Sequence, residues 1–244
     1  MTRMFTINGR RMTTWNVFVG CLFNCIYCHA REEALTRLRH IARYRDGFKP
    51  HLVWSEMNRR FRPGDFVFIC YMGDISWAAR HELELIWRYI ALFPETRFLF
   101  ISKAPMVFLQ WLEWGFEPTA NIYFGTTIES NIDHGVTTAP APELRYRAMV
   151  ELQHPHKFIS IEPLMNFHLC TLVNWIKEIG PEIVEIGPDN YGNNLPEPAS
   201  LISGAMNAWK VRTLLEMLRE FVPMLVEKPG LSRLLDNAAA PRSS

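Results

Sequence analysis

The chain has 244 residues, of which 48% are apolar and 21% are charged, the balance of an ordinary soluble globular protein. The longest apolar runs, such as residues 66–72, have the length of a strand and are far too short to span a bilayer. Five cysteines are an odd number in a chain that is not small, which argues against a disulfide framework. We therefore expect a cytoplasmic enzyme with no membrane partner.

The formal net charge of +1 is unevenly distributed along the chain. Residues 1–62 carry 12 of the 26 Arg and Lys but only 4 of the 25 Asp and Glu, a local net charge of +8, whereas residues 63–244 carry −7. Such asymmetry can indicate an anionic partner such as nucleic acid. No dense basic run with interleaved aromatic residues is present, so we favour packing of the basic part beside the acidic part.

Apolar periodicity predicts strands and helices that alternate along the chain. Strands are expected at 13–19, 66–71, 97–101, 121–124, 158–161, 182–186 and 223–226. Helices are expected at 30–44, between 50 and about 60, around 83–90, from 105 onward, at 142–152, around 169–176 and at 209–218. This alternation calls for a parallel sheet with right-handed crossovers, in which chemistry collects where the strands end. The small, polar residues 237–244 are expected to be disordered, which leaves 1–236 as one domain.

Three cysteines lie in one short loop directly after the first predicted strand. Cys21, Cys25 and Cys28 are spaced at i, i+4 and i+7, and no fourth cysteine is nearby. Cysteine thiolates are the usual ligands of iron–sulfur clusters, normally four to a cluster. A cubane held by three cysteines would leave one iron open to a ligand from outside the protein.

The same loop has competing interpretations. Cys25, Cys28 and His29 fit the C-x-x-C-H pattern of c-type haem attachment, but the N-terminus lacks the apolar region of an export signal, and Cys21 would have no role. A Cys3His zinc site is the structural alternative. His29 directly follows Cys28, however, and adjacent residues rarely bind the same ion.

The C-x3-C-x2-C spacing, with Tyr27 before the last cysteine, resembles the signature of the radical S-adenosylmethionine (SAM) superfamily. This resemblance implies a single-domain α/β fold, a partial (β/α)6 TIM-like barrel. It also implies a [4Fe-4S] cluster on the three cysteines, with SAM bound to the open iron. The reduced cluster of that family splits SAM into methionine and a 5′-deoxyadenosyl radical. An external electron donor of the flavodoxin or ferredoxin type would supply the electron.

Four short sequence motifs resemble those of one branch of this superfamily, the phage Gp37/Gp68-like radical SAM proteins of unknown function. They occur in the order Tyr-Met-Gly-Asp-Ile75, Ile-Ser-Lys-Ala-Pro105, Tyr-Phe-Gly-Thr-Thr-Ile-Glu-Ser-Asn131 and Ser-Ile-Glu-Pro-Leu164. The likeness covers roughly residues 15–235. That group usually has longer loops that are richer in cysteine, and it brings no assigned substrate.

Gly73 and Asp74 end the second predicted strand, where the superfamily carries a Gly-Gly-Glu-like motif that receives the SAM amine. A glycine lets the backbone approach closely, and a carboxylate suits an ammonium group. The plainer alternative is a strand-to-helix turn that Asp74 caps. Ser102 and Lys103 end the third strand. Lys103 could bind the SAM carboxylate or an acidic substrate, or be a solvated lysine.

Thr126, Thr127 and Glu129 follow the fourth predicted strand, where superfamily members commonly contact the SAM ribose and methionine groups. Hydroxyl and carboxylate groups are suitable partners for a diol. Glu162 ends the fifth strand as a ligand or substrate contact, or as a charge at a helix N-terminus. Tyr27 is expected to lie against the adenine.

The resulting hypothesis is a radical SAM enzyme that abstracts hydrogen from an unidentified substrate. The sequence identifies no further catalytic residue. Two alternatives stay open: an iron–sulfur or zinc module without SAM turnover, and a radical SAM enzyme directed at nucleic acid, which the charge pattern allows but does not favour.

Overall fold

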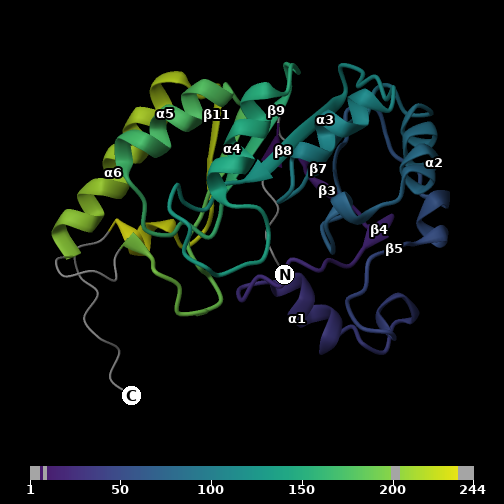
Figure 1. Ribbon diagram of the computed structural model, residues 1–244, viewed down its shortest axis with the longest axis horizontal. Coiled ribbons are helices and arrows are strands. Elements are labelled where there is room, and N and C mark those ends of the chain that lie inside the picture. Colours follow the sequence, from purple (N-terminus) through teal and green to yellow (C-terminus); the bar gives the residue numbers. More distant parts are fainter. Residues whose placement is uncertain (1–5, 8–9, 199–203, 236–244) are drawn as a thin grey trace. The chain divides into compact units, whose positions relative to one another are not determined.

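The computed structural model describes residues 6–7, 10–198 and 204–235, and Figure 1 shows its helices and strands. Seven strands form one sheet, and every neighbouring pair with a defined register is parallel. The hydrogen-bonded order is β11-β10-β9-β8-β7-β6-β3. The bounds are β3 (Thr13–Trp15), β6 (Phe66–Ile69), β7 (Arg97–Ile101), β8 (Ile122–Thr127), β9 (Lys157–Ile161), β10 (Ile183–Ile186) and β11 (Met224–Glu227).

Helices connect the successive strands of the sheet from β6 to β11. The α-helices are α1 (His29–Leu35), α2 (Arg80–Ile90), α3 (Met106–Glu113), α4 (Pro142–Glu151), α5 (Leu169–Ile179) and α6 (Gly204–Phe221). Short 3-10 helices are η1 (Ala42–Tyr44), η2 (Trp54–Asn58), η3 (Ile75–Trp77) and η5 (Leu231–Leu234). Two short antiparallel pairs complete the described elements: β1 (Thr6–Ile7) with β2 (Arg10–Arg11), and β4 (Phe18–Val19) with β5 (His51–Leu52). The predicted alternation of strand and helix is therefore confirmed.

The helix α2 illustrates why these segments are helical. Leu83, Ile86 and Ile90 are buried at intervals of three and four residues, the spacing of one helix face. At its start the Glu82 carboxylate accepts a hydrogen bond from the Ala79 N–H at 2.9 Å. This bond satisfies one of the backbone donors that a helix start leaves without an intrahelical partner.

The segment after the cysteine loop differs from the prediction. The helix expected at 30–44 ends at Leu35, where α1 stops, and η1 follows after a series of turns. The helix expected between 50 and about 60 is wrong, because β5 and η2 occupy that stretch. Pairing of β5 with β4 explains this second difference, since a tertiary strand contact overrides the local helical spacing.

The chain forms two compact units. Unit 1 is Met1–Thr126 with Val136–Ala139, and unit 2 is Thr127–Gly135 with Pro140–Ser244. The predicted extent of the domain, 1–236, stays a prediction, and the tail at 237–244 lies outside the described residues. Within the part of the chain that the structure describes, no helix has the length and apolar character needed to cross a membrane.

Each unit has its own buried core. Aromatic side chains fill much of unit 1, with ring centroids 5.2 Å apart between Trp15 and Phe61 and 4.6 Å apart between Phe108 and Phe124. Such aromatic pairs add to the stability gained from the area they bury. The buried face of α5 in unit 2 is instead aliphatic: Leu172, Val173, Ile176 and Ile179.

Candidate cluster and SAM site

A close backbone contact between two glycines places the cysteine loop at the end of β6. The Gly20 N–H donates to the Met72 carbonyl at 2.9 Å, and the Asp74 N–H donates to the Gly20 carbonyl at 3.1 Å. A Cβ on Gly73 would lie 2.7 Å from the Gly20 nitrogen, closer than real Cβ atoms approach backbone. Glycine is therefore required at this crossing, and the next residue of the loop is Cys21.

The loop then enters α1 through its last cysteine. The Cys28 N–H donates to the Cys25 carbonyl at 3.2 Å, and the Cys28 carbonyl accepts from the Glu32 N–H at 3.1 Å. Cys28 is the N-cap residue of α1, and its sulfur accepts from the Arg31 N–H at 3.4 Å. Asn24 adopts a positive φ of 53°, which reverses the chain between the first two cysteines.

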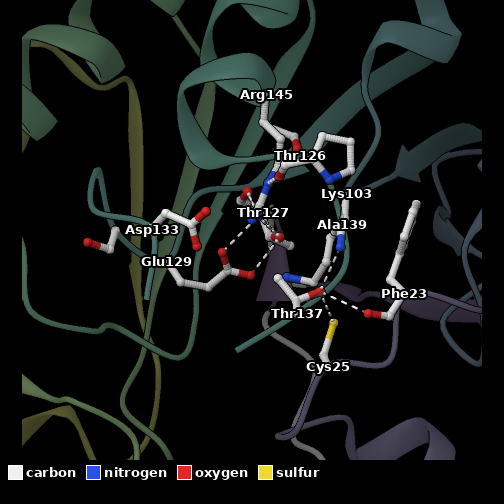
Figure 2. A network of polar contacts seen from close by, with 12 residues as sticks. Phe23, Cys25, Lys103, Thr126, Thr127, Glu129, Asp133, Thr137, Ala139 and Arg145 are labelled. Carbon is white, nitrogen blue, oxygen red and sulfur yellow. Dashed lines mark hydrogen bonds and ion pairs between the residues drawn. The ribbon is translucent and has the colours of Figure 1, made fainter. Parts of the chain in front are cut away.

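Each of the three sulfurs has a hydrogen-bonding partner in unit 1. Besides the contact to Cys28, the Phe23 N–H donates to the Cys21 sulfur at 3.4 Å. The Thr137 hydroxyl lies 3.1 Å from the Cys25 sulfur. Figure 2 shows this contact as a dashed line. Donors aimed at cysteine sulfurs are among the features that set the potential of iron–sulfur clusters. The donor set of three thiols thus fits a cluster of that kind.

Burial keeps two of these thiols protonated when no metal is bound. It raises the pKa of Cys21 to about 12, and the negative charge of Asp74 adds to the rise. Burial also raises the pKa of Cys28, although the Arg31 N–H opposes it. A bound metal would deprotonate such ligands and release protons. Among the described residues no three His, Cys, Asp or Glu side chains are placed to hold a single metal ion.

Asp74 joins the ends of β6 and β7. Its carboxylate accepts from the Ser102 hydroxyl at 2.7 Å, from the Lys103 N–H at 2.9 Å and from the Ser76 N–H at 3.0 Å. The Ser102 carbonyl in turn accepts from the Thr126 hydroxyl at 2.8 Å. Four predicted site residues in unit 1 are therefore linked: Asp74, Ser102, Lys103 and Thr126. The capping role weighed for Asp74 is present, through the bond to Ser76.

Lys103 is directed at the cysteine loop. Its ammonium group donates to the Tyr27 hydroxyl at 2.9 Å and lies 5.2 Å from the centre of the Tyr27 ring. Its positive charge also lowers the pKa of Cys28, although less than burial raises it. The structure thus brings Tyr27 and Lys103, 76 positions apart in the sequence, into direct contact.

In unit 2 the predicted residues Thr127 and Glu129 bind an arginine that the sequence did not reveal. The guanidinium of Arg145 donates to the Glu129 carboxylate at 2.8 Å and to the Thr127 carbonyl at 2.9 Å. The Thr127 hydroxyl donates to the other Glu129 oxygen at 2.9 Å. Figure 2 shows these three side chains together. Both carboxylate oxygens are therefore engaged within the protein, and Glu129 is only 1% exposed.

Glu162 belongs to a second, partly buried charge group in unit 2. The Lys228 ammonium lies 3.1 Å from both the Glu162 and the Glu185 carboxylates. Glu185 also accepts from the Ser160 hydroxyl at 2.8 Å. Burial raises the pKa of Glu162, whereas the positive charge of Lys228 opposes that rise. This group occupies the ends of β9, β10 and β11, where sequence analysis had found only Glu162.

The site residues that sequence analysis missed are Thr137, Arg145, Glu185 and Lys228. Lys228 directly follows β11, so the rule that placed the other strand-end residues would have found it. Arg145 lies in α4 and Thr137 in a connecting loop, and neither position carries a local pattern.

Comparisons with known proteins point to one fold. No protein-family model matches this chain, and no curated protein matches it. Three solved structures of spore photoproduct lyase are similar to it: a cysteine-to-alanine mutant with dinucleoside spore photoproduct, the enzyme complexed with dinucleoside spore photoproduct, and a tyrosine-to-phenylalanine mutant. Their TM-scores are 0.56, 0.54 and 0.55, each at 11% identity over 87% of this chain and 75% of the other. The likeness confirms the predicted fold, an α/β partial TIM-like barrel.

Proposed function

We propose that this protein is a radical SAM enzyme. The observation that carries the proposal is the cysteine loop, in which Cys21, Cys25 and Cys28 each have a hydrogen-bonding partner at the sulfur. The loop crosses the end of β6 at Gly73, directly before Asp74. The fold supports the same proposal, because spore photoproduct lyase is a radical SAM enzyme.

The three cysteines would hold a [4Fe-4S] cluster with one iron left for SAM. When bound, the reduced cluster would supply the electron that converts SAM into a 5′-deoxyadenosyl radical. The chain itself would position and shield the cofactor. In unit 1 the backbone at Gly73 and the Asp74 carboxylate would receive the SAM amine, and Lys103 would place a positive charge near the SAM carboxylate.

The other predicted contacts in unit 1 follow from the same arrangement. Tyr27, held by Lys103, would lie against the adenine, while Ser102 and Thr126 would fix the strand ends. Thr127, Glu129 and Glu162, which belong to unit 2, remain predictions as SAM contacts. The likeness to the phage-associated group, the external electron donor and a cytoplasmic location also remain part of the proposal.

Anaerobic reconstitution with iron and sulfide tests the proposal. The expected product absorbs broadly near ~400 nm and forms 5′-deoxyadenosine from SAM when dithionite is added. Replacing Cys21, Cys25 and Cys28 together by alanine should abolish both signals. Cys170→Ala is the matched control, since this cysteine is exposed and lies in α5.

Each other outcome of that experiment contradicts the proposal in a different way. A colourless protein with zinc at the cysteine loop would establish the zinc module. A cluster that forms but never cleaves SAM would establish a redox or binding module. Absorbance that persists in the triple variant would show that the cluster lies elsewhere in the chain.

The chemistry of the structural neighbours favours nucleic acid as a second candidate for the substrate class. Two of the similar structures hold a dinucleoside spore photoproduct. The net charge of +8 in residues 1–62 would complement phosphate groups. Oligonucleotide binding that weakens steeply as salt rises would support this class. Binding that is absent, or insensitive to salt, would remove it.

A further inference from the structure

The segment Val136–Ala139 packs along the middle of the cysteine loop, and both belong to unit 1. The Ile26 N–H donates to the Val136 carbonyl at 3.0 Å, and the Thr138 N–H donates to the Phe23 carbonyl at 2.8 Å. These bonds join positions more than 100 residues apart in the sequence. They place Thr137, which lies between the two bonded positions, beside Cys25.

Hydrogen bonding at the Phe23 carbonyl leaves the Thr137 hydroxyl hydrogen available. That carbonyl already accepts from the Thr138 N–H at 2.8 Å and from the Thr138 hydroxyl at 2.7 Å, which fills its two lone pairs. The Thr137 hydroxyl donates to the same carbonyl at the longer distance of 3.1 Å, and its oxygen accepts from the Ala139 N–H at 3.1 Å. The Phe23 carbonyl therefore does not need the Thr137 hydrogen.

Iron binding decides which atom donates across the 3.1 Å contact between the Cys25 sulfur and the Thr137 oxygen. A thiol can donate its own hydrogen to Thr137. A sulfur bound to iron has no hydrogen and can only accept. In an iron-bound protein the Thr137 hydroxyl would then be the donor, and its 3.1 Å contact is shorter than the two N–H contacts of 3.4 Å to Cys21 and Cys28.

We propose that Thr137 is a positioning residue that donates a hydrogen bond to the iron-bound Cys25 sulfur and raises the reduction potential of the cluster. Reduction adds negative charge to the cluster and its sulfurs, and a donor at a sulfur stabilises that charge. This inference rests on the proposed function, because it requires a cluster on the cysteine loop. It requires neither SAM nor substrate.

The test is the midpoint potential of the reconstituted cluster, measured without SAM by dye titration and electron paramagnetic resonance. Thr137→Val keeps the shape and removes the hydroxyl. We expect about a tenfold lower ratio of reduced to oxidised cluster at a fixed potential, equivalent to about 59 mV for one electron. Thr137→Ser keeps the hydroxyl and should retain the wild-type potential.

Thr36→Val is the matched control, because that hydroxyl donates to the Glu32 carbonyl at the end of α1 and touches no sulfur. It should leave the potential unchanged. Should Thr137→Val not fold, Thr137→Ala removes the same hydroxyl without added bulk. The hyperfine coupling of the hydroxyl hydrogen to the cluster is identified as a proton signal that disappears in deuterated solvent. This exchangeable signal should be present in wild type and Thr137→Ser and absent from the variants without the hydroxyl.

The outcomes separate this inference from the proposed function. A wild-type protein that binds no iron at the loop would overturn the proposed function. A loaded protein whose potential is the same in wild type and Thr137→Val would overturn the role of Thr137 alone. Equal shifts in Thr137→Val and Thr137→Ser would also overturn it, since serine keeps the hydroxyl and loss of the hydrogen bond could not then explain both.

Discussion

The carboxylate of Asp74 is 6% exposed and accepts three hydrogen bonds from within unit 1. A carboxylate has about four lone-pair positions, so one acceptor position is left for a ligand such as the SAM amine. The structural role and the proposed binding role are therefore compatible at this residue. Substitution of Asp74 can separate the two roles, because the structural role predicts lost stability and the binding role predicts lost SAM affinity.

We expect Asp74→Ala to lower the free energy of unfolding by about 3 kcal/mol. The change leaves buried donors on Ser102 and Lys103 without their acceptor, and bonds to a charged group are worth about 1.5–3 kcal/mol each. Urea denaturation of the cluster-free protein measures this. Asp65→Ala is the control, with one exposed bond to the Arg62 N–H and an expected cost of about 1 kcal/mol. Unchanged stability with lost SAM binding would show that Asp74 is a ligand without a structural role.

How much of the site the sequence predicts depends on how local each residue's role is. Cys21, Cys25, Cys28 and Asp74 are recognisable because loop spacing and strand ends are local features. Thr137 is not, since its contact with Cys25 spans 112 positions and only the folded chain creates it. The same holds for Arg145, whose long side chain is almost fully buried in unit 2.

Strand β4 leads into the cysteine loop, and the crossing of Gly20 and Gly73 connects it to the end of β6. A methyl group on Gly73 would meet backbone atoms of Gly20 and Val19 at 2.7–2.9 Å. Backbone atoms held by hydrogen bonds cannot move aside as a flexible side chain can. The crossing therefore tolerates no side chain at this position.

Gly73→Ala should destabilise the protein by about 3 kcal/mol and reduce the iron bound per chain, because separating the strand ends displaces Cys21. Gly115→Ala is the matched control. Its positive φ of 86° also disfavours alanine, by about 1–2 kcal/mol, but no atom lies within 4 Å of the added carbon. Iron content after reconstitution separates the two: full loading of Gly73→Ala would contradict the role given to the crossing.

The strands and helices were predictable to different degrees. Six of the seven sheet strands were predicted within a few residues because each is a short apolar run bounded by turn residues, such as β7 at Arg97–Ile101. The strand expected at 13–19 is instead divided into β3 and β4, which belong to different sheets. The region from 50 to 60 was not predicted, because the conformation at its start depends on pairing between β4 and β5. Propensity and periodicity describe a segment alone, and here a distant partner decides the conformation.

The division of the chain into two units predicts which of its segments cluster binding stabilises. All three cysteines, together with the segment Val136–Ala139, belong to unit 1. A ligand that binds only the folded state stabilises what it binds. Loading the cluster should therefore suppress local opening of the loop and of the elements bonded to it, while amides in unit 2 need not respond.

Hydrogen exchange followed by mass spectrometry measures which segments the cluster protects. The comparison is between cluster-free and reconstituted protein, both without SAM. Peptides covering the loop, α1 and Val136–Ala139 should exchange more slowly once the cluster is bound, because the ligated sulfurs fix the loop and its hydrogen bonds. Peptides from α5 and β10, both in unit 2, are the internal control and should exchange at the same rate in the two forms. Protection confined to the loop, without Val136–Ala139, would contradict the coupling of Thr137 to Cys25. Equal protection of both units would contradict the prediction that the cluster stabilises unit 1 alone.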